Sequence, residues 1–302
     1  MKNFFSQNNI KILVAGDIML HESQLKYFET LRKACNDNVD VMTADLFSKD
    51  LRLLLASSNA VLGNLETVTN DVLAYQGYPK FNAPTLMLQI VKRLGFTDLV
   101  VSNNHSKDHD YETWLETVES LKALGVRTHG DVEEAKSLKN LQTVKVIAGS
   151  DRFNKQFDGI DDGYLANKYY KPLNKQQFVT LNQAFSGYPR LLYFHAGKEY
   201  YEGISEDQAD ILKAIGNDPK ILATFLTHSH VLGEAYKRNK FDTKLENGLG
   251  NFTSMQEKLE RQIGGIVEYS YNPKTNEFTF IKRHIVETVL NNDGSWQTKL
   301  IT

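Results

Sequence analysis

Short apolar runs that end abruptly in polar residues recur along this chain. The clearest are KILVAGD (11–17), NAVLGNLE (59–66), DLVVSNNH (98–105), RLLYFHAGKE (190–199) and ILATFLTHSH (221–230). A continuous β-prone apolar run of this length is typical of a strand buried on both faces. NGLGNF (247–252) is a weaker instance of the same pattern. We therefore predict a series of buried strands, each followed by a polar cluster.

Helical spacing of apolar residues lies between these runs. Residues 84–94 place Pro84 in a first turn and are followed by Gly95, and residues 111–124 form one apolar helical face before Gly125. Ser205 has the capping-box spacing to Gln208. Strands that alternate with helices predict a layered α/β protein with substantial parallel sheet.

Two segments depart from this alternation. Residues 151–189 are polar and aromatic without a clear period, which predicts an irregular surface excursion. Residues 264–287 contain two alternating runs around NPKTN, which predict an antiparallel hairpin. The chain has no Pro-, Gly- or Ser-rich linker, solenoid repeat or low-complexity tract, so we expect one domain over residues 1–302.

Composition limits the class of protein. The 302 residues are 41% hydrophobic and 24% charged, which is typical of a globular chain. The formal net charge of −2 argues against general binding to nucleic acid or anionic membranes, both of which need a basic excess. Cys35 is the single cysteine and forms no intramolecular disulfide. Without a visible signal peptide or membrane anchor, we expect a cytoplasmic protein; the oligomeric state stays open.

The polar residues after the apolar runs are candidates for one shared site. In open α/β sheets, ligands bind beyond the carboxyl ends of the strands. We therefore expect convergence of Asp17, Glu66, Asn104, His105, His195, His228 and His230. Carboxylates, an amide oxygen and imidazoles together favour a divalent Mn, Fe or Zn ion over Ca²⁺ or a thiolate site.

Each candidate also has a structural interpretation. Asp17 alone fits a helix cap, and His195 alone fits a core histidine. His228 and His230 stand two apart, so they point the same way if the segment is extended. The joint occurrence of all these candidates at several strand ends favours a metal site. His21, His129 and His284 lack such context, and we interpret them as structural.

His105 is a candidate proton donor, because imidazole is the usual group that protonates a leaving group near neutral pH. Asp108, three residues on, can accept from the other ring nitrogen and fix the tautomer. A helix cap is the alternative role for Asp108 or Asp110. Asp110 fits that position better, since the helix is predicted to begin near Tyr111.

The order of several short motifs resembles one family. GDIML, GNLET, FNAP, NNHSKD, HAGKEY, THSHV and GLGNF follow one another over about residues 10–255. This order resembles the CapA-type family of capsule-biosynthesis, or poly-gamma-glutamate synthesis, proteins. The family is similar to calcineurin-like metallophosphoesterases, so the resemblance implies a β-sandwich flanked by helices, in four αββα layers.

The resemblance also implies roles for individual residues. One or two divalent ions would be bound by a set of six ligands: Asp17, Glu66, Asn104, His195, His228 and His230. His105 would be the proton donor, supported by Asp108. The same motifs contain candidates for the substrate pocket, which are Asn64, Asn103, Glu199 and Asn251.

Several positions depart from the family pattern. The arginine expected shortly after GDxML is absent from His21–Ser23, and Asn82 replaces a second arginine. Ala196 stands in place of a tryptophan, Ser229 in place of a proline and Asp110 in place of a glycine. The proposed ligands are retained while the groups around them change. The remaining cationic candidates are Lys80, Lys107 and Lys198.

Three functions follow from this pattern. The first is a metal-dependent hydrolase that uses activated water on a phosphoester or a γ-glutamyl amide of an anionic small molecule or polymer. The second is a non-enzymatic accessory or binding protein for synthesis or export of a capsule polymer. The third is a member that keeps metal for stability alone. We favour the hydrolase because the proposed ligand set is complete.

Overall fold

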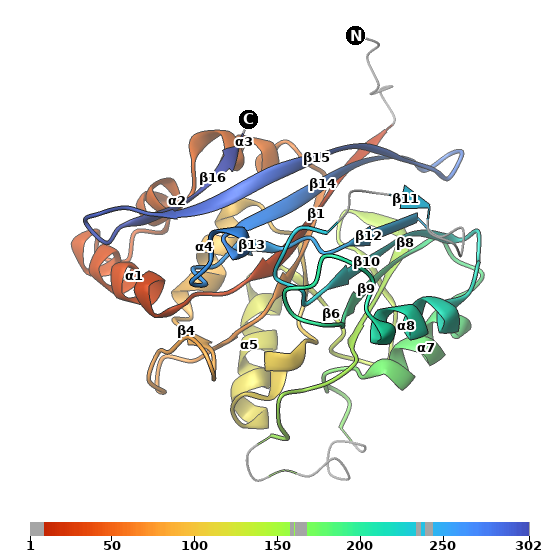
Figure 1. The fold of residues 1–302 in the computed structure, drawn as a ribbon, viewed down its shortest axis with the longest axis horizontal. Coiled ribbons are helices and arrows are strands. Elements are labelled where there is room, and N and C mark those ends of the chain that lie inside the picture. Colours follow the sequence, from red (N-terminus) through yellow and green to blue (C-terminus); the bar gives the residue numbers. More distant parts are fainter. Residues whose placement is uncertain (1–8, 158–159, 161–167, 234–236, 239–243, 302) are drawn as a thin grey trace.

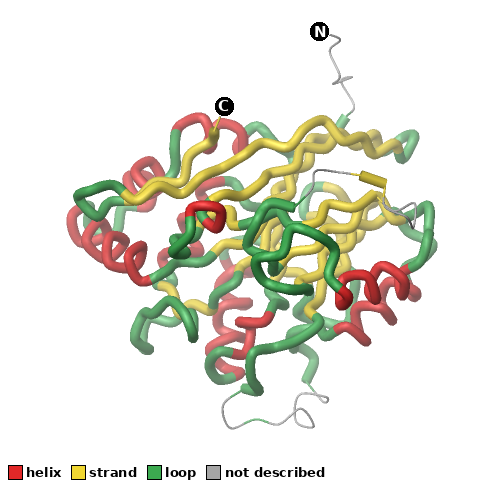
Figure 2. Tube along the Cα trace, viewed as in Figure 1, coloured by secondary structure: helices red, strands yellow, loops and turns green. Residues whose placement is uncertain are grey.

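Two β-sheets pack face to face at the centre of the molecule. The computed structural model describes residues 9–157, 160, 168–233, 237–238 and 244–301. Figure 2 shows the strands gathered centrally and the helices outside them. The continuous apolar runs of the sequence supply strands in both sheets.

The first sheet joins a parallel half to an antiparallel half. Its order is β16 (Trp296–Ile301), β15 (Glu277–Leu290), β14 (Ile263–Asn272), β1 (Ile10–Ile18), β2 (Ala60–Leu65), β5 (Asp98–Val100) and β6 (Arg127–His129). Strands β1, β2, β5 and β6 are mutually parallel, so their carboxyl ends share one edge. Strand β13 (Asn251–Thr253) pairs parallel with the end of β1.

The second sheet is parallel in its centre. Its order is β11 (Lys237–Arg238), β12 (Lys244–Asn247), β10 (Ile221–Thr227), β9 (Arg190–His195), β8 (Leu141–Ser150) and β7 (Lys136–Leu138). Strands β12, β10, β9 and β8 are parallel, and β11 and β7 are antiparallel edges. A short pairing of β3 (Val68–Thr69) with β4 (Asn82–Ala83) stands apart from both sheets.

Helices cover the outer faces of the two sheets (Figure 1). Those on the first sheet are α1 (Glu22–Ala34), α2 (Val39–Leu46), α3 (Lys49–Ala56), α4 (Leu86–Leu94) and α5 (Tyr111–Ala123). Those on the second sheet are α7 (Lys175–Ala184) and α8 (Glu206–Ile215). Two 3₁₀ turns, η1 (Asn104–Lys107) and η2 (Leu259–Arg261), follow β5 and precede β14. No described helix is long and apolar enough to span a bilayer.

Alternation along the strands explains the continuous apolar runs. In β1, Ile12 and Val14 pack in the core between the sheets, whereas Leu13 and Ala15 pack against the helices. Strand β9 divides its residues in the same way between the inter-sheet core and the second helix layer. Because successive side chains point to opposite faces, a strand between two apolar layers must be apolar throughout. The predicted four-layer αββα β-sandwich is confirmed.

Local sequence patterns predicted the positions of most elements close to those observed. Helix α5 begins after Asp110, whose side chain accepts from Thr113 N, and α4 ends at Gly95 with φ 121°. The Ser205–Gln208 capping box is present at α8. Strands β14 and β15 pair antiparallel around the predicted turn at residues 273–276.

The predicted irregular excursion over residues 151–189 is wrong in its second half. Residues 175–184 form α7, which has an Asn174 capping box with Gln177 and buries Phe178 and Leu181. The few apolar residues of this segment stand among polar neighbours and give only a weak helical period. The sequence pattern therefore did not predict the helix. Residues 158–159 and 161–167 of the segment lie outside the described part of the chain.

Candidate metal centre

Parallel strands from both sheets deliver their carboxyl ends to one buried place. Asp17 lies near the end of β1, Glu66 follows β2, and His195 ends β9. His228 and His230 follow β10. All five side chains are buried. The structure therefore brings together five of the seven side chains that the strand-end pattern predicts to converge.

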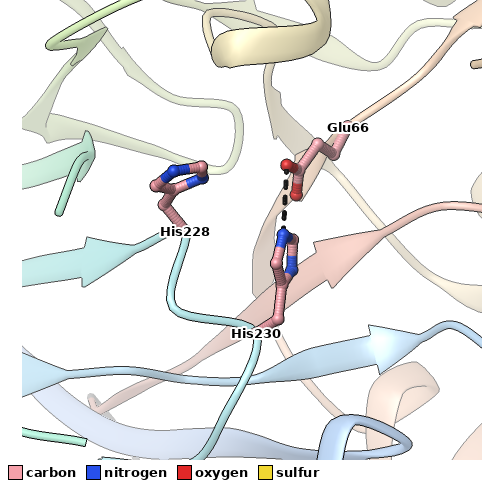
Figure 3. A group of neighbouring side chains, drawn as sticks. All are labelled: Glu66, His228 and His230. Atoms are coloured by element: carbon pink, nitrogen blue, oxygen red, sulfur yellow. Dashed lines mark ion pairs between the residues drawn. The ribbon is translucent and has the colours of Figure 1, made fainter. Parts of the chain in front are cut away.

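Glu66 lies at the centre of the cluster. Its Oε1 is 3.3 Å from His195 Nε2 and 3.8 Å from His230 Nε2. His230 Nδ1 lies 3.5 Å from Asp17 Oδ2. Figure 3 shows Glu66 and His230 facing one another, with His228 beside them.

Two groups of possible ligands share Glu66. The first is Asp17, Glu66 and His195, and the second is Glu66, His228 and His230. In each group, one ligand atom per residue lies within 4.8 Å of the others. A carboxylate with two oxygens can bind one ion with each, so this arrangement fits a pair of ions as well as a single one.

Unsatisfied buried atoms indicate that the cluster suits a cation. Asp17 Oδ2, both Glu66 carboxylate oxygens and His228 Nδ1 are buried without a hydrogen-bond partner among the described residues. Burial of such groups without partners is costly. Burial, reinforced by the neighbouring Glu66 charge, raises the pKa of Asp17 well above its usual value, and burial likewise raises the pKa of Glu66. A divalent ion would offset both penalties.

The histidines are suited to act as neutral ligands. Burial lowers the pKa of His195 well below its ordinary value, and the neighbouring imidazoles lower it further. The pKa of His228 is lowered for the same reasons. Imidazole binds metal in its neutral form, so these nitrogens need not lose a proton near neutral pH. Together with the carboxylates, the donor set fits Mn, Fe or Zn.

Asn104 turns its amide oxygen toward the cluster. Its Oδ1 lies 2.8 Å from His195 Nε2, and its Nδ2 donates to Asn154 Oδ1 at 3.2 Å. The backbone N–H of Asn154 also donates to the carbonyl of Asn104. Asn154 therefore holds the amide with its oxygen inward, in an orientation compatible with the ligand role that the family resemblance implies.

His105 and Asp108 form the close pair that their spacing predicts. Asp108 Oδ2 lies 2.6 Å from His105 Nδ1 and also accepts from the backbone N–H of Phe81 at 2.9 Å. The Phe81 ring meets the His105 ring edge to face, with centroids 4.6 Å apart. Burial lowers the pKa of His105, but the hydrogen bond and charge of Asp108 outweigh it and leave the pKa raised.

Two of the four candidate pocket residues, Asn64 and Asn251, contact proposed ligands, and Asn103 contacts Asn64. Asn64 donates to Asp17 Oδ1 at 2.8 Å, and Asn103 donates to Asn64 Oδ1 at 3.0 Å. Asn251 Oδ1 lies 2.9 Å from His230 Nδ1. All three amides are fully buried, so their hydrogen-bonding capacity is used in orienting the cluster. Glu199 alone is exposed and lines a pocket.

That pocket opens beside His228. Its volume is about 760 Å³, and its lining includes Arg152, Asn154, Lys198, Glu199 and Tyr201. Arg152 is paired with Asp151 at 3.0 Å and Asp207 at 2.5 Å, so its charge is largely compensated. The pocket is therefore mixed in charge rather than strongly basic.

The segment after β10 is not extended, contrary to the assumption behind the His228–His230 prediction. His228 has φ 94° and His230 has φ 55°, both in the left-handed region that non-glycine residues rarely adopt. The two imidazoles face the cluster because the chain turns sharply, not because they alternate along a strand. Such backbone strain is concentrated at functional sites.

Three further histidines outside the cluster have local partners. His129 Nε2 contacts Asp98 at 2.9 Å and His284 Nε2 contacts Glu268 at 2.7 Å, in agreement with structural roles. His21 is the N-cap of α1 and lies edge to face with Phe81. Burial, with the charges of His230 and His105, lowers its pKa to about 4.

One substituted family position, Asn82, and one remaining cationic candidate, Lys107, have local partners. Asn82, where the resemblance expects an arginine, is buried and donates to the carbonyls of Asn70, Leu73 and Ala74. Lys107 is buried, donates to Gln156 and lies over the Phe153 ring. Neither side chain is directed by these contacts at the cluster.

Sequence reasoning missed four residues beside the site. Asn154 and Arg152 come from the segment predicted to be irregular, Tyr200 lies on a loop, and Arg261 ends η2. Only HAGKEY, which contains Tyr200, marked any of them by pattern. Their positions depend on how the loops fold over the strand ends.

Comparison with known proteins identifies a family. The model described as "Bacterial capsule synthesis protein PGA_cap" matches residues 11–256. No curated protein sequence matches the chain. Among solved structures, a phosphatase from Mycoplasma pneumoniae has a TM-score of 0.45 and 12% identity, covering 92% of this chain and 92% of its own.

Two further structures are similar over most of their length. A hypothetical protein from Thermus thermophilus has a TM-score of 0.47 and 12% identity, covering 97% of this chain and 100% of its own. The calcineurin-like phosphoesterase YfkN from Bacillus subtilis has a TM-score of 0.45 and 11% identity, covering 91% and 89%.

Proposed function

Since the chain belongs to the PGA_cap family of bacterial capsule synthesis proteins, we propose that it is a metal-dependent hydrolase that acts on an anionic substrate. One observation carries the proposal: two buried carboxylates with unpartnered oxygens lie among three histidines, and Glu66 belongs to both ligand groups. The bond attacked is a phosphoester or a γ-glutamyl-type amide.

The proposed ligands are Asp17, Glu66, Asn104, His195, His228 and His230. When bound, a divalent ion supplies Lewis-acid polarisation of a substrate oxygen and lowers the pKa of water. The chain's own part is to hold these donors in place with Asn64, Asn251 and Asn154, which reduces the reorganisation needed at the site.

His105 then protonates the leaving group. Asp108 accepts a hydrogen bond from the Nδ1–H of His105. Nε2 is therefore the nitrogen left to carry and release a proton. The raised pKa of His105 keeps the imidazole protonated closer to neutral pH. Phe81 packs against the ring and restricts its rotation.

Elemental analysis of protein purified without chelators tests the metal, and hydrolysis of phosphoester and γ-glutamyl substrates tests the chemistry. We expect bound transition metal and turnover that chelation abolishes. His105→Ala should lower kcat by about 10²–10⁴-fold while the metal content persists. Substoichiometric metal at every transition element would exclude the proposal, and loss of metal from the variant would identify His105 as a ligand.

A second candidate is an accessory protein that binds a capsule polymer without cleaving it, which the family description favours. Binding of poly-gamma-glutamate by chelated protein, together with no cleavage by the metal-loaded form, would support this function over hydrolysis.

A further inference from the structure

Arg261 carries an uncompensated positive charge at the edge of the cluster. It ends η2, beyond residues 11–256 that the family model matches. Its Cζ lies 3.3 Å from the centroid of the Tyr200 ring, so the guanidinium stacks on that ring. Its Nε is buried without a hydrogen bond, and Arg261 forms no ion pair with a carboxylate in the described ranges.

Tyr200 connects this arginine to the metal cluster. Its ring centroid lies 6.3 Å from that of the His230 ring, and the two ring planes are tilted by 40°. Tyr200 adopts φ 61° and donates its backbone N–H to Ser229 O at 2.7 Å. A tyrosine in the left-handed region is held there by its surroundings at a conformational cost. The fold therefore holds this ring near both His230 and Arg261.

A second connection runs through Asn251. Its Oδ1 lies 2.9 Å from His230 Nδ1, and its Nδ2 donates to the carbonyl of Arg261 at 2.7 Å. The same amide thus fixes a proposed ligand and the backbone of the arginine. Arg261 is positioned from both its main chain and its side chain.

Other cations near the site are less suited to bind a substrate anion. Arg152 is neutralised by Asp151 and Asp207. Lys107 is buried against Gln156 and Phe153. Lys198 is exposed, so its charge is hydrated. Arg261 combines an available guanidinium with a rigid aromatic support.

We propose that Arg261, stacked on Tyr200, binds an oxyanion of the substrate beside His230. The group is a phosphate or a carboxylate, since a guanidinium fork matches both bidentately. Stacking occupies the face of the guanidinium and leaves its edge N–H groups for the anion. The inference rests on the proposed function, because it assigns a substrate group to the same site. Arg261 would supply the positive charge that the resemblance expects from arginines near His21–Ser23 and at Asn82.

Isothermal titration calorimetry of the manganese-loaded protein tests this subsite with two probes, inorganic phosphate and glutarate. Arg261→Ala should weaken binding by about tenfold or more, which corresponds to about 1.4 kcal/mol. Arg261→Lys should recover only part of the affinity, because an ammonium has no fork. Lys258→Ala, an exposed position in the same turn, removes the same charge and should bind as the wild type does.

The two probes identify the source of the oxyanion, because the larger loss marks the preferred group. Unchanged affinity for both probes in a fully metal-loaded Arg261→Ala protein would overturn the inference, as would wild-type protein that binds neither. If wild-type protein binds no manganese, the proposed function fails instead, and titration of the metal-free protein still tests Arg261. Should Arg261→Ala fail to fold, Arg261→Gln and Arg261→Lys serve as the comparison.

Discussion

Replacing Glu66 by glutamine is expected to change stability in opposite directions with and without bound metal. Glu66 is fully buried, and neither of its oxygens has a hydrogen-bond partner in the described part of the chain. In metal-free protein its ionised form is opposed by burial, and Asp17 lies beside it. Glutamine keeps the shape of the side chain and removes its charge. Without metal, Glu66→Gln should therefore be more stable than the wild type.

The size of this difference depends on pH. A folded-state pKa above the unfolded value means that the folded chain binds more protons, so stability falls as pH rises through the raised pKa. One such group contributes about 1.4 kcal/mol per pH unit over that interval. The lowered pKa values of His195 and His228 act in the opposite sense at acid pH. Because wild type and Glu66→Gln both contain these histidines, the contributions of the histidines largely cancel in the stability difference between the two proteins.

Metal should reverse the order of stability. At a free ion concentration one hundred times Kd, binding adds about 2.7 kcal/mol to the wild-type free energy of unfolding. For a chain of this length that corresponds to a rise in Tm of roughly 5 °C. Glu66→Gln loses the carboxylate that both ligand groups share, so it should lose most of this gain.

Urea denaturation between about pH 5 and pH 8, in EDTA and in MnCl₂, measures both effects. Glu257→Gln is the matched control, because Glu257 is exposed and should show neither effect. Parallel pH curves for wild type and Glu66→Gln in EDTA would refute the argument from burial. Undiminished stabilisation of Glu66→Gln by manganese would refute the shared-ligand argument.

Three further changes separate proton transfer, ligand orientation and helix stability. Asp108→Asn removes the charge that raises the pKa of His105, so the limb on which the rate falls as pH rises should move to lower pH; an unmoved limb in the kcat profile would contradict this. Asn154→Ala removes the acceptor of the Asn104 amide and should weaken metal binding by about tenfold in competition with a chelating dye, whereas equal affinity would remove Asn154 from the site. Asp110→Ala removes the cap on α5 and should cost about 1 kcal/mol in urea denaturation with no change in metal content; loss of metal would show that the cap also supports η1.

The strand-end residues were predictable because burial on both faces leaves a distinct pattern. A strand between two apolar layers has no polar position until it ends, so Asp17, Glu66 and His195 stand out at the ends of β1, β2 and β9. The close pair of His105 and Asp108 was predictable from local spacing, since η1 brings residues three apart together. Both inferences need only neighbours in the chain.

The orienting amides could not be assigned from the sequence. An asparagine next to a ligand is equally compatible with a role in the pocket and with a role in the cluster. Asn64 and Asn251 hydrogen-bond Asp17 and His230 because β2 and β13 flank β1 in the first sheet, a pairing across sequence-distant strands. No local period records which strand lies beside β1, so the assignment requires the assembled sheet.

The site also depends on backbone conformations that sequence patterns argue against. His228, His230 and Tyr200 all adopt positive φ, although glycine is the residue that usually does so. The preference of these residues is for extended or helical backbone, and their motif therefore predicts an extended segment. Tertiary contacts override that preference: the Tyr200 N–H to Ser229 O bond joins the two turns, and the turns bring His230 to Glu66 and Tyr200 to Arg261. The same turns position the proposed ligands and the proposed anion subsite. Relaxing either turn should therefore disturb both metal binding and anion binding, so a loss of anion affinity is informative only in a protein with full metal content.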